Sequence, residues 1–130
     1  MHKNLQPPGW PRPSGYSNGS LAKGEEMIFI SGQIGWNASG KFEHVDFPAQ
    51  VRQALTNVMT ILNEAGANGE HIVRMTWYIT DKQAYLSNLK AVGRIYRETV
   101  GHYFPPMSVV EVSALIEDEA RVEIEVTAVK

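Results

Sequence analysis

The side chains best suited to proton transfer are Glu123 and Glu125, two carboxylates that alternate with apolar residues near the end of the chain. Residues at i and i+2 of a strand share one face, so both carboxylates are expected to point the same way. Such a pair most often forms a solvated strand edge. Glu125 lies deeper in the apolar strand, where a carboxylate needs a hydrogen-bond partner or becomes easier to protonate. Either condition suits a group that exchanges protons with a substrate.

A second candidate is Ser31-Gly32-Gln33, which follows the apolar run at 28–30. The run has the length and residue types of a strand, and it ends with a hydroxyl, a residue without Cβ and an amide. A glycine lets another group approach the backbone closely, which suits one wall of a small-molecule site. The same residues are equally typical of a bulge at Gly32 and a turn at Gly35. Both interpretations stay open on this stretch alone.

Other chemistries find little support among the residues. The chain has no cysteine, which excludes disulfides, thiolate catalysis and cysteine-ligated metals. Ser31 lies outside a Gly-x-Ser-x-Gly pattern, and Gly32 and Gly35 match no phosphate-binding loop. The four histidines lie far apart without a second ligand at metal spacing: His2, His44, His71 and His102. We therefore expect neither a metal site nor a nucleophilic serine.

The composition is that of a small globular protein. The chain has 130 residues, of which 43% are hydrophobic, and this size predicts one domain spanning 1–130. Its 12 basic residues are outnumbered by 14 acidic ones and form no cluster, so a nucleic-acid partner is not expected. No apolar run approaches the ~20 residues of a transmembrane helix, and the first residues lack the apolar segment of a signal peptide. These features, with the absence of cysteine, predict a soluble cytoplasmic protein without a membrane partner.

Two helices are predicted from apolar residues at three- and four-residue spacing. The first spans 46–65 and begins at Asp46, a suitable N-cap. The second begins at Thr80-Asp81-Lys82-Gln83, which has capping-box spacing, and ends at Gly101. On the polar face of the first helix we expect four amides to face water: Gln50, Gln53, Asn57 and Asn63.

The strands are predicted from alternating or apolar residues and lie at 20–22, from Met27 through the apolar run at 28–30, and at 72–79, 107–115 and 121–129. The order ββ-α-β-α-ββ indicates an α+β fold with two helices packed on one face of a mixed sheet. Several strands are apolar on both faces, so we expect a closed oligomer that packs sheet against sheet. The Pro- and Gly-rich loop at 7–19 carries Trp10 and Tyr16, which either anchor the loop, the favoured interpretation, or line a site.

Four short motifs stand along the chain: Gly15-Tyr16-Ser17, Ser31-Gly32-Gln33, Phe104-Pro105-Pro106-Met107-Ser108 and Val122-Glu123-Ile124-Glu125. Read together, they make the chain similar, nearly end to end, to the RidA/YjgF family, also labelled endoribonuclease L-PSP. The resemblance implies a chorismate-mutase-like fold and a homotrimer with three ligand sites in clefts between subunits. It also implies hydrolysis of reactive imines and enamines derived from amino acids, releasing ammonia and a keto acid without a cofactor.

The resemblance also implies roles for individual residues. The family's site tyrosine would be Tyr16, and its strand-end serine and glycine would be Ser31 and Gly32. Glu125 would be the carboxylate that positions the attacking water. The family's diagnostic arginine follows Pro-Ala, and this chain has Met107 at that position.

The replacement by Met107 has a physical consequence for substrate binding. A guanidinium holds a carboxylate through two parallel hydrogen bonds, and a charged hydrogen bond contributes about 1.5–3 kcal/mol. A 2-imino acid should therefore bind about 10- to 100-fold more weakly unless another cation substitutes. Arg12, four residues before Tyr16, is the nearest candidate in sequence.

Three functions follow as hypotheses. The first is a deaminase-like hydrolase whose substrate is shifted from 2-imino acids toward an enamine or a ring-derived aminated acid. The second is a non-catalytic protein that binds small metabolites in the same cleft. The third is a ribonuclease, which the acidic balance of charge disfavours.

Overall fold

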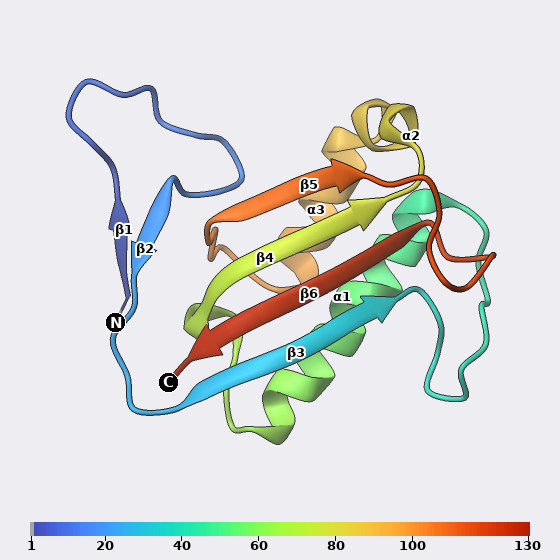
Figure 1. Ribbon diagram of the computed structural model, residues 1–130, viewed down its shortest axis with the longest axis horizontal. Helices are drawn as coiled ribbons and strands as arrows, with labels where there is room; N and C mark the ends of the chain where they lie inside the picture. The colour runs from blue at the N-terminus through green and yellow to red at the C-terminus, as the bar shows by residue number, and fades with distance from the viewer. Residues whose placement is uncertain (1) are drawn as a thin grey trace.

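The computed structural model describes residues 2–130, which build a four-stranded sheet with helices on one side (Figure 1). The strand order is β3-β6-β4-β5. β4 and β5 run parallel, whereas β6 is antiparallel to both of its neighbours. The sheet is therefore mixed, as predicted. The bounds are Met27–Ile34 for β3, Ile72–Ile79 for β4, Met107–Glu111 for β5 and Val122–Val129 for β6.

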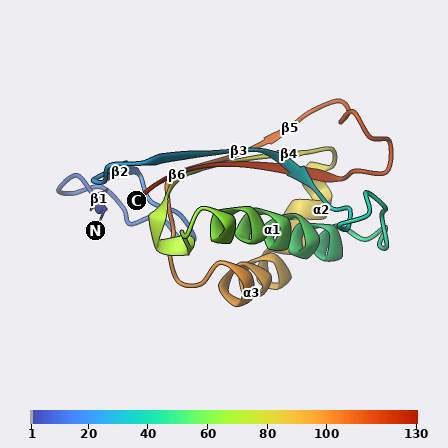
Figure 2. The ribbon, with the colours of Figure 1, turned by 90° about the horizontal axis from the view of Figure 1, so that it is seen from below.

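The helices α1 (Phe47–Glu64), α2 (Lys82–Ser87) and α3 (Leu89–Thr99) lie on one face of the sheet (Figure 2). α1 begins as expected, because the Asp46 carboxylate accepts a hydrogen bond from the Ala49 amide at 3.1 Å. It ends before Gly66, whose positive φ of +70° favours glycine. The apolar side of α1 is buried against β3, β6 and α3 and forms the centre of the core.

Two predicted elements differ in extent. The predicted second helix is interrupted at Asn88, whose side chain donates to the Ala84 carbonyl at 2.6 Å and whose backbone leaves helical geometry. Three helices therefore cover the sheet instead of two. β5 ends at Glu111, where a strand to residue 115 was predicted, because its neighbour β4 ends at Ile79, the register partner of Glu111. The last backbone bond between the two strands is donated by the Val112 amide to the Ile79 carbonyl at 2.8 Å.

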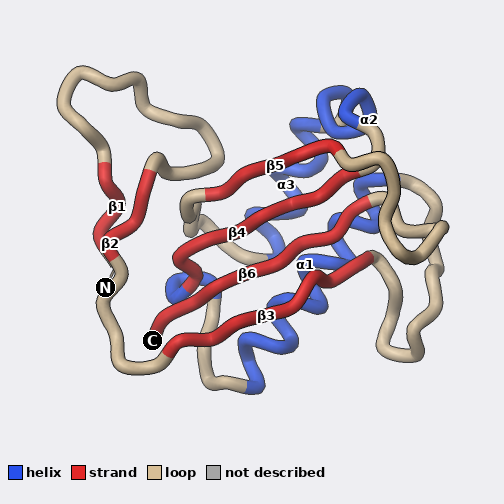
Figure 3. The backbone as a smooth tube through the Cα atoms, viewed as in Figure 1, coloured by secondary structure: helices blue, strands red, loops and turns tan. Residues whose placement is uncertain are grey.

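An N-terminal hairpin forms a separate two-stranded sheet, which stands apart from the main sheet (Figure 3). It consists of β1 (Lys3–Leu5), which was not predicted, and β2 (Gly19–Leu21), close to the strand predicted at 20–22. The long loop between them is fixed by Ser17, whose amide and hydroxyl donate to the carbonyls of Pro105 and Phe104. These two bonds hold the preceding Tyr16 beside the start of β5.

Two amides of α1 bind protein and do not face water as predicted. Gln50 is completely buried and bonds three backbone groups, namely the carbonyls of His44 and Glu119 and the amide of Arg121. Asn57 donates to the carbonyls of Ile34 and Trp36 at 3.1 and 2.9 Å. α1 therefore fixes the end of β3 and the start of β6, the two strands that carry half of the predicted site residues.

The sheet face opposite the helices is open. Its side chains include the aromatic ring of Phe29, which is 72% exposed, beside hydroxyls and charged groups of β4 and β6. Figure 2 shows all three helices on the other side of the sheet. The predicted site residues are divided between this open face and the edge at β5.

Candidate functional site

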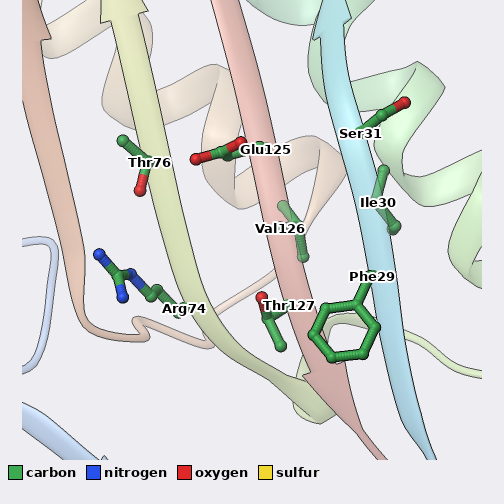
Figure 4. A pocket seen from close by; sticks show the side chains of 8 residues that line it. All are labelled: Phe29, Ile30, Ser31, Arg74, Thr76, Glu125, Val126 and Thr127. Atoms are coloured by element: carbon green, nitrogen blue, oxygen red, sulfur yellow. The ribbon is translucent and has the colours of Figure 1, made fainter.

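A pocket of about 480 Å³ lies on the open face, where β3, β6 and β4 run side by side. We call it the sheet-face pocket, and Figure 4 shows its side chains. It contains two of the predicted site residues, Ser31 and Glu125, together with a cation that was not predicted, Arg74. Thr76 and Thr127 add hydroxyl groups, and Phe29 adds an apolar surface. The pocket thus combines a carboxylate, hydroxyls and a guanidinium.

Glu125 is exposed, which corrects the expectation that it lies deep in the strand. Even-numbered residues of β6 point into the core, so their odd-numbered neighbours point to the open face. Glu125 does have the hydrogen-bond partner expected of a proton-transferring carboxylate, since the Tyr78 hydroxyl donates to its Oε1 at 2.8 Å. This hydrogen bond is the main cause of the raised pKa of Tyr78, and the nearby charge of Arg74 opposes the rise. Tyr78 was not singled out from the sequence.

Gly32 lies against the second carboxylate of β6. The register of β3 on β6 shifts between Ile30 and Gln33, so a bulge is present, as one of the two interpretations had it. A Cβ at Gly32 would overlap the side chain of Glu123. The close approach is therefore made by the chain's own Glu123, and the interpretation of this stretch as a wall for a small molecule stays a prediction. The Gln33 amide donates to the Ser31 carbonyl at 3.0 Å and helps to fix this bulge.

Tyr16 and Met107 lie away from the sheet-face pocket, around the first residues of β5. A pocket of about 420 Å³, which we call the β5-edge pocket, contains both residues together with Arg74 and Ser108. A larger pocket of about 870 Å³, the helix-side pocket, contains Tyr16 and Met107 with aromatic residues of the core and of α2 and α3. Tyr16 is 43% exposed and lines both pockets, as the second interpretation of this residue had it. The helix-side pocket is lined mainly by apolar and aromatic side chains.

The structure separates the two arginines that could bind an anion. Arg12 is exposed and lines none of these three pockets. Arg74 lines both the sheet-face pocket and the β5-edge pocket. The alternation of 72–79 places Arg74 on the polar face of its strand, but only the strand order brings it between Glu125 and Met107. Trp10, the other aromatic residue of the loop, is 60% exposed and lines none of the three pockets.

Two further features belong to residues 2–130, the part of the chain that the structure describes. In that part of the chain no three His, Asp or Glu side chains come together in a group that could hold a metal ion. Among the helices described there, none has both the length and the apolar character needed to cross a bilayer.

The fold and the distribution of polar residues define an α+β protein of the chorismate-mutase-like class. The sequence model described as "Endoribonuclease L-PSP" matches residues 11–130, and the chain belongs to this family, which includes the RidA/YjgF proteins. A "RutC family protein" of Aquifex aeolicus is 38% identical, over a match that covers 98% of this chain and 99% of that protein. A "2-iminobutanoate/2-iminopropanoate deaminase" of Capra hircus is 34% identical, over a match that covers 82% of this chain and 74% of that protein. The crystal structure of YyfB, a conserved Rid family protein from Yersinia pestis, has a TM-score of 0.87 at 30% identity, covering 99% of this chain and 98% of its own.

Proposed function

We propose that the chain is a cofactor-independent hydrolytic deaminase that acts on a reactive imine or enamine. The observation that carries this proposal is the sheet-face pocket, where Glu125 is oriented by Tyr78 and shares the cavity with Ser31. The relatives named as 2-iminobutanoate/2-iminopropanoate deaminases, at up to 34% identity, support the same class of reaction. The lack of cysteine is consistent with a cytoplasmic location.

In the proposed reaction Glu125 takes a proton from a water molecule, whose oxygen attacks the carbon of the C=N bond. The nitrogen gains a proton as the C=N double bond becomes single, which gives a carbinolamine. A second proton transfer to nitrogen and loss of the hydroxyl proton then break the C–N bond and leave a C=O group. Water and the imine become a carbonyl compound and ammonia, so no oxidant or cofactor is required. An enamine first takes a proton at carbon and becomes the imine.

Met107 shifts the substrate preference. It carries no charge, and it packs against the core from the start of β5. A 2-imino acid gains no ion pair at this position, which lowers its binding about 10- to 100-fold relative to a site with an arginine there. We therefore propose that the preferred substrate is not a simple 2-imino acid held at residue 107.

We also propose that the working protein is a homotrimer with its sites between subunits. Ser31 and Glu125 line one pocket of the chain, whereas Tyr16 and Met107 line two others. A cleft between subunits would add residues of the next chain to these pockets, and the open sheet face leaves a surface for such packing. The mass in solution tests this point, since a monomer at micromolar concentration would contradict it.

The catalytic proposal is tested with Glu125→Gln, which keeps the shape of the side chain and removes the base. We expect kcat on imine substrates to fall about 10²- to 10⁴-fold, the usual effect of losing a general base. Glu123→Gln is the matched control, because that carboxylate lies two residues away on the same strand. A large loss in Glu123→Gln with little change in Glu125→Gln would move the role to Glu123. Unchanged turnover in both variants would refute carboxylate catalysis.

A second function is favoured by Met107, whose lack of charge also suits a protein that binds metabolites without converting them. It predicts no turnover on a broad panel of imines and enamines, together with thermal stabilisation by a small carboxylic acid. Turnover of any member of the panel that depends on Glu125 would exclude it.

A further inference from the structure

We propose that Arg74 binds a carboxylate group of the substrate and so replaces the cation that is missing at residue 107. The inference rests on the function proposed above and specifies its substrate class, an imine or enamine that carries a carboxylate. It assigns binding to a residue of β4, the strand beside β5.

The position of Arg74 carries the proposal. On one side its neighbour Met75 is the register partner of Met107, so Arg74 stands beside the start of β5. On the other side Arg74 is paired with Thr127 and is therefore a diagonal neighbour of Glu125, whose own partner is Thr76. Diagonal neighbours of this kind lie about 7–8 Å apart, a distance that a small molecule can bridge.

The direction of the side chain fits the same role. Figure 4 shows Arg74 extending across β4, away from Glu125 and toward β5. This direction leads to the β5-edge pocket, where the guanidinium is accompanied by the hydroxyl-bearing side chains of Tyr16 and Ser108. A guanidinium with neighbouring hydroxyl groups is suited to a carboxylate, which accepts several hydrogen bonds.

Arg74 is also free to bind a ligand. It is exposed, and within residues 2–130 it forms neither an ion pair nor a side-chain hydrogen bond. The nearest carboxylate on its own face, Glu125, is bonded to Tyr78. Arg52, by comparison, is paired with Glu98 at 2.6 Å. The unpaired guanidinium therefore loses no protein contact when it binds an anion.

Two other arginines fit the role less well. Arg12 lines none of the three pockets. Arg97 lines the helix-side pocket, but this pocket contains neither Ser31 nor Glu125, and the guanidinium lies over Gly93 of its own helix. Among these three, Arg74 alone lines a pocket with Glu125 and a pocket with Met107.

The test measures binding and turnover separately. Binding of 2-oxobutanoate, a stable keto acid, is compared with binding of the neutral ketone 2-butanone by calorimetry, in the wild type and in the variants Arg74→Ala, Arg74→Lys, Arg97→Ala and Arg12→Ala. We expect Arg74→Ala to weaken 2-oxobutanoate binding about 10- to 100-fold and Arg74→Lys to retain part of it. Arg97→Ala and Arg12→Ala should stay within about twofold of the wild type, and 2-butanone should be insensitive to all four changes. Melting temperatures show that each variant is folded.

Each outcome decides the point. If Arg74→Ala binds 2-oxobutanoate as the wild type does, or if the loss occurs in Arg97→Ala, the proposal is wrong. It is equally wrong if the wild type does not bind 2-oxobutanoate at millimolar concentration. Loss of binding in Arg74→Ala, in a protein that hydrolyses no imine, would support the carboxylate site and refute the deaminase function. Turnover of 2-iminobutanoate that falls in Arg74→Ala, with unchanged turnover of a neutral imine, would support both.

Discussion

Replacing Gln50 by leucine should destabilise the protein strongly, although Gln50 lies on a helix and carries no charge. Its Nε2 donates to the His44 and Glu119 carbonyls at 3.0 and 2.9 Å, and its Oε1 accepts from the Arg121 amide at 2.8 Å. Leucine has a similar volume but leaves all three backbone groups without this partner. The substitution therefore tests the hydrogen bonds more than the packing.

The size of the effect follows from those three bonds. A hydrogen bond contributes about 1 kcal/mol net, and a buried backbone group left unpaired costs about 1–3 kcal/mol. Because Gln50 is completely buried, water does not compensate, and we expect a loss of about 3–5 kcal/mol in the free energy of unfolding. This is a large part of the 5–15 kcal/mol by which domains are usually stable, so the melting temperature should fall by about 10 °C or more.

Urea denaturation at one fixed protein concentration measures the change. Gln53→Leu is the matched control, because Gln53 lies on the same helix, is only half-buried and bonds only the Asn57 side chain at 2.9 Å. The control should lose about 0.5 kcal/mol or less. If Gln50→Leu costs under about 1 kcal/mol, or no more than Gln53→Leu, then Gln50 does not hold the two segments together as argued.

Three further outcomes are expected. In the Arg74→Ala background, Met107→Arg should raise kcat/KM on 2-iminobutanoate about 10- to 100-fold, and an unchanged value would show that a charge at this position does not limit binding. Gly32→Ala should cost under about 1 kcal/mol of stability, because the Glu123 carboxylate that it meets can turn aside, and a protein that fails to fold would contradict this. Burial raises the pKa of Tyr96, so the unfolded chain loses that proton first, and stability should fall as the pH rises above about 10. Tyr96→Phe should reduce the slope of stability against pH by at most about 1.4 kcal/mol per pH unit, and an unchanged slope in alkaline urea titrations would refute this assignment.

The elements with a strong pattern were predicted closely. The helix predicted at 46–65 is α1 at Phe47–Glu64, because its cap and its apolar stripe are local features. The strand predicted at 72–79 is β4 with the same bounds, since its alternation reflects one buried and one open face. The break at Asn88 was missed, because the apolar spacing continues across it and only the side-chain bond to Ala84 reveals it.

The burial of individual polar residues was harder to predict. Gln50 has the residue type of Gln53 but lies in the buried stripe of α1, three residues after Phe47 and four before Ala54. Gln50 is buried because the segments at His44 and Glu119 pass over it. The contact with Glu119 joins residues 69 positions apart, so it depends on the tertiary fold.

The same reason explains why the sequence indicated Arg12 as the substitute cation. Arg12 is close to Tyr16 along the chain, whereas Arg74 is 58 positions from it and reaches the same pocket only because β4 lies beside β5. On a sheet, side chains of two neighbouring strands can reach the same site, so a residue of one strand can take over the role of a residue of the other. A charge lost from β5 can therefore be supplied by β4 while the catalytic carboxylate on β6 stays in place. If Arg74 binds the carboxylate, the substrate approaches Glu125 from a different direction than a 2-imino acid held at residue 107. The strand order therefore predicts a changed preference among imines that carry a carboxylate.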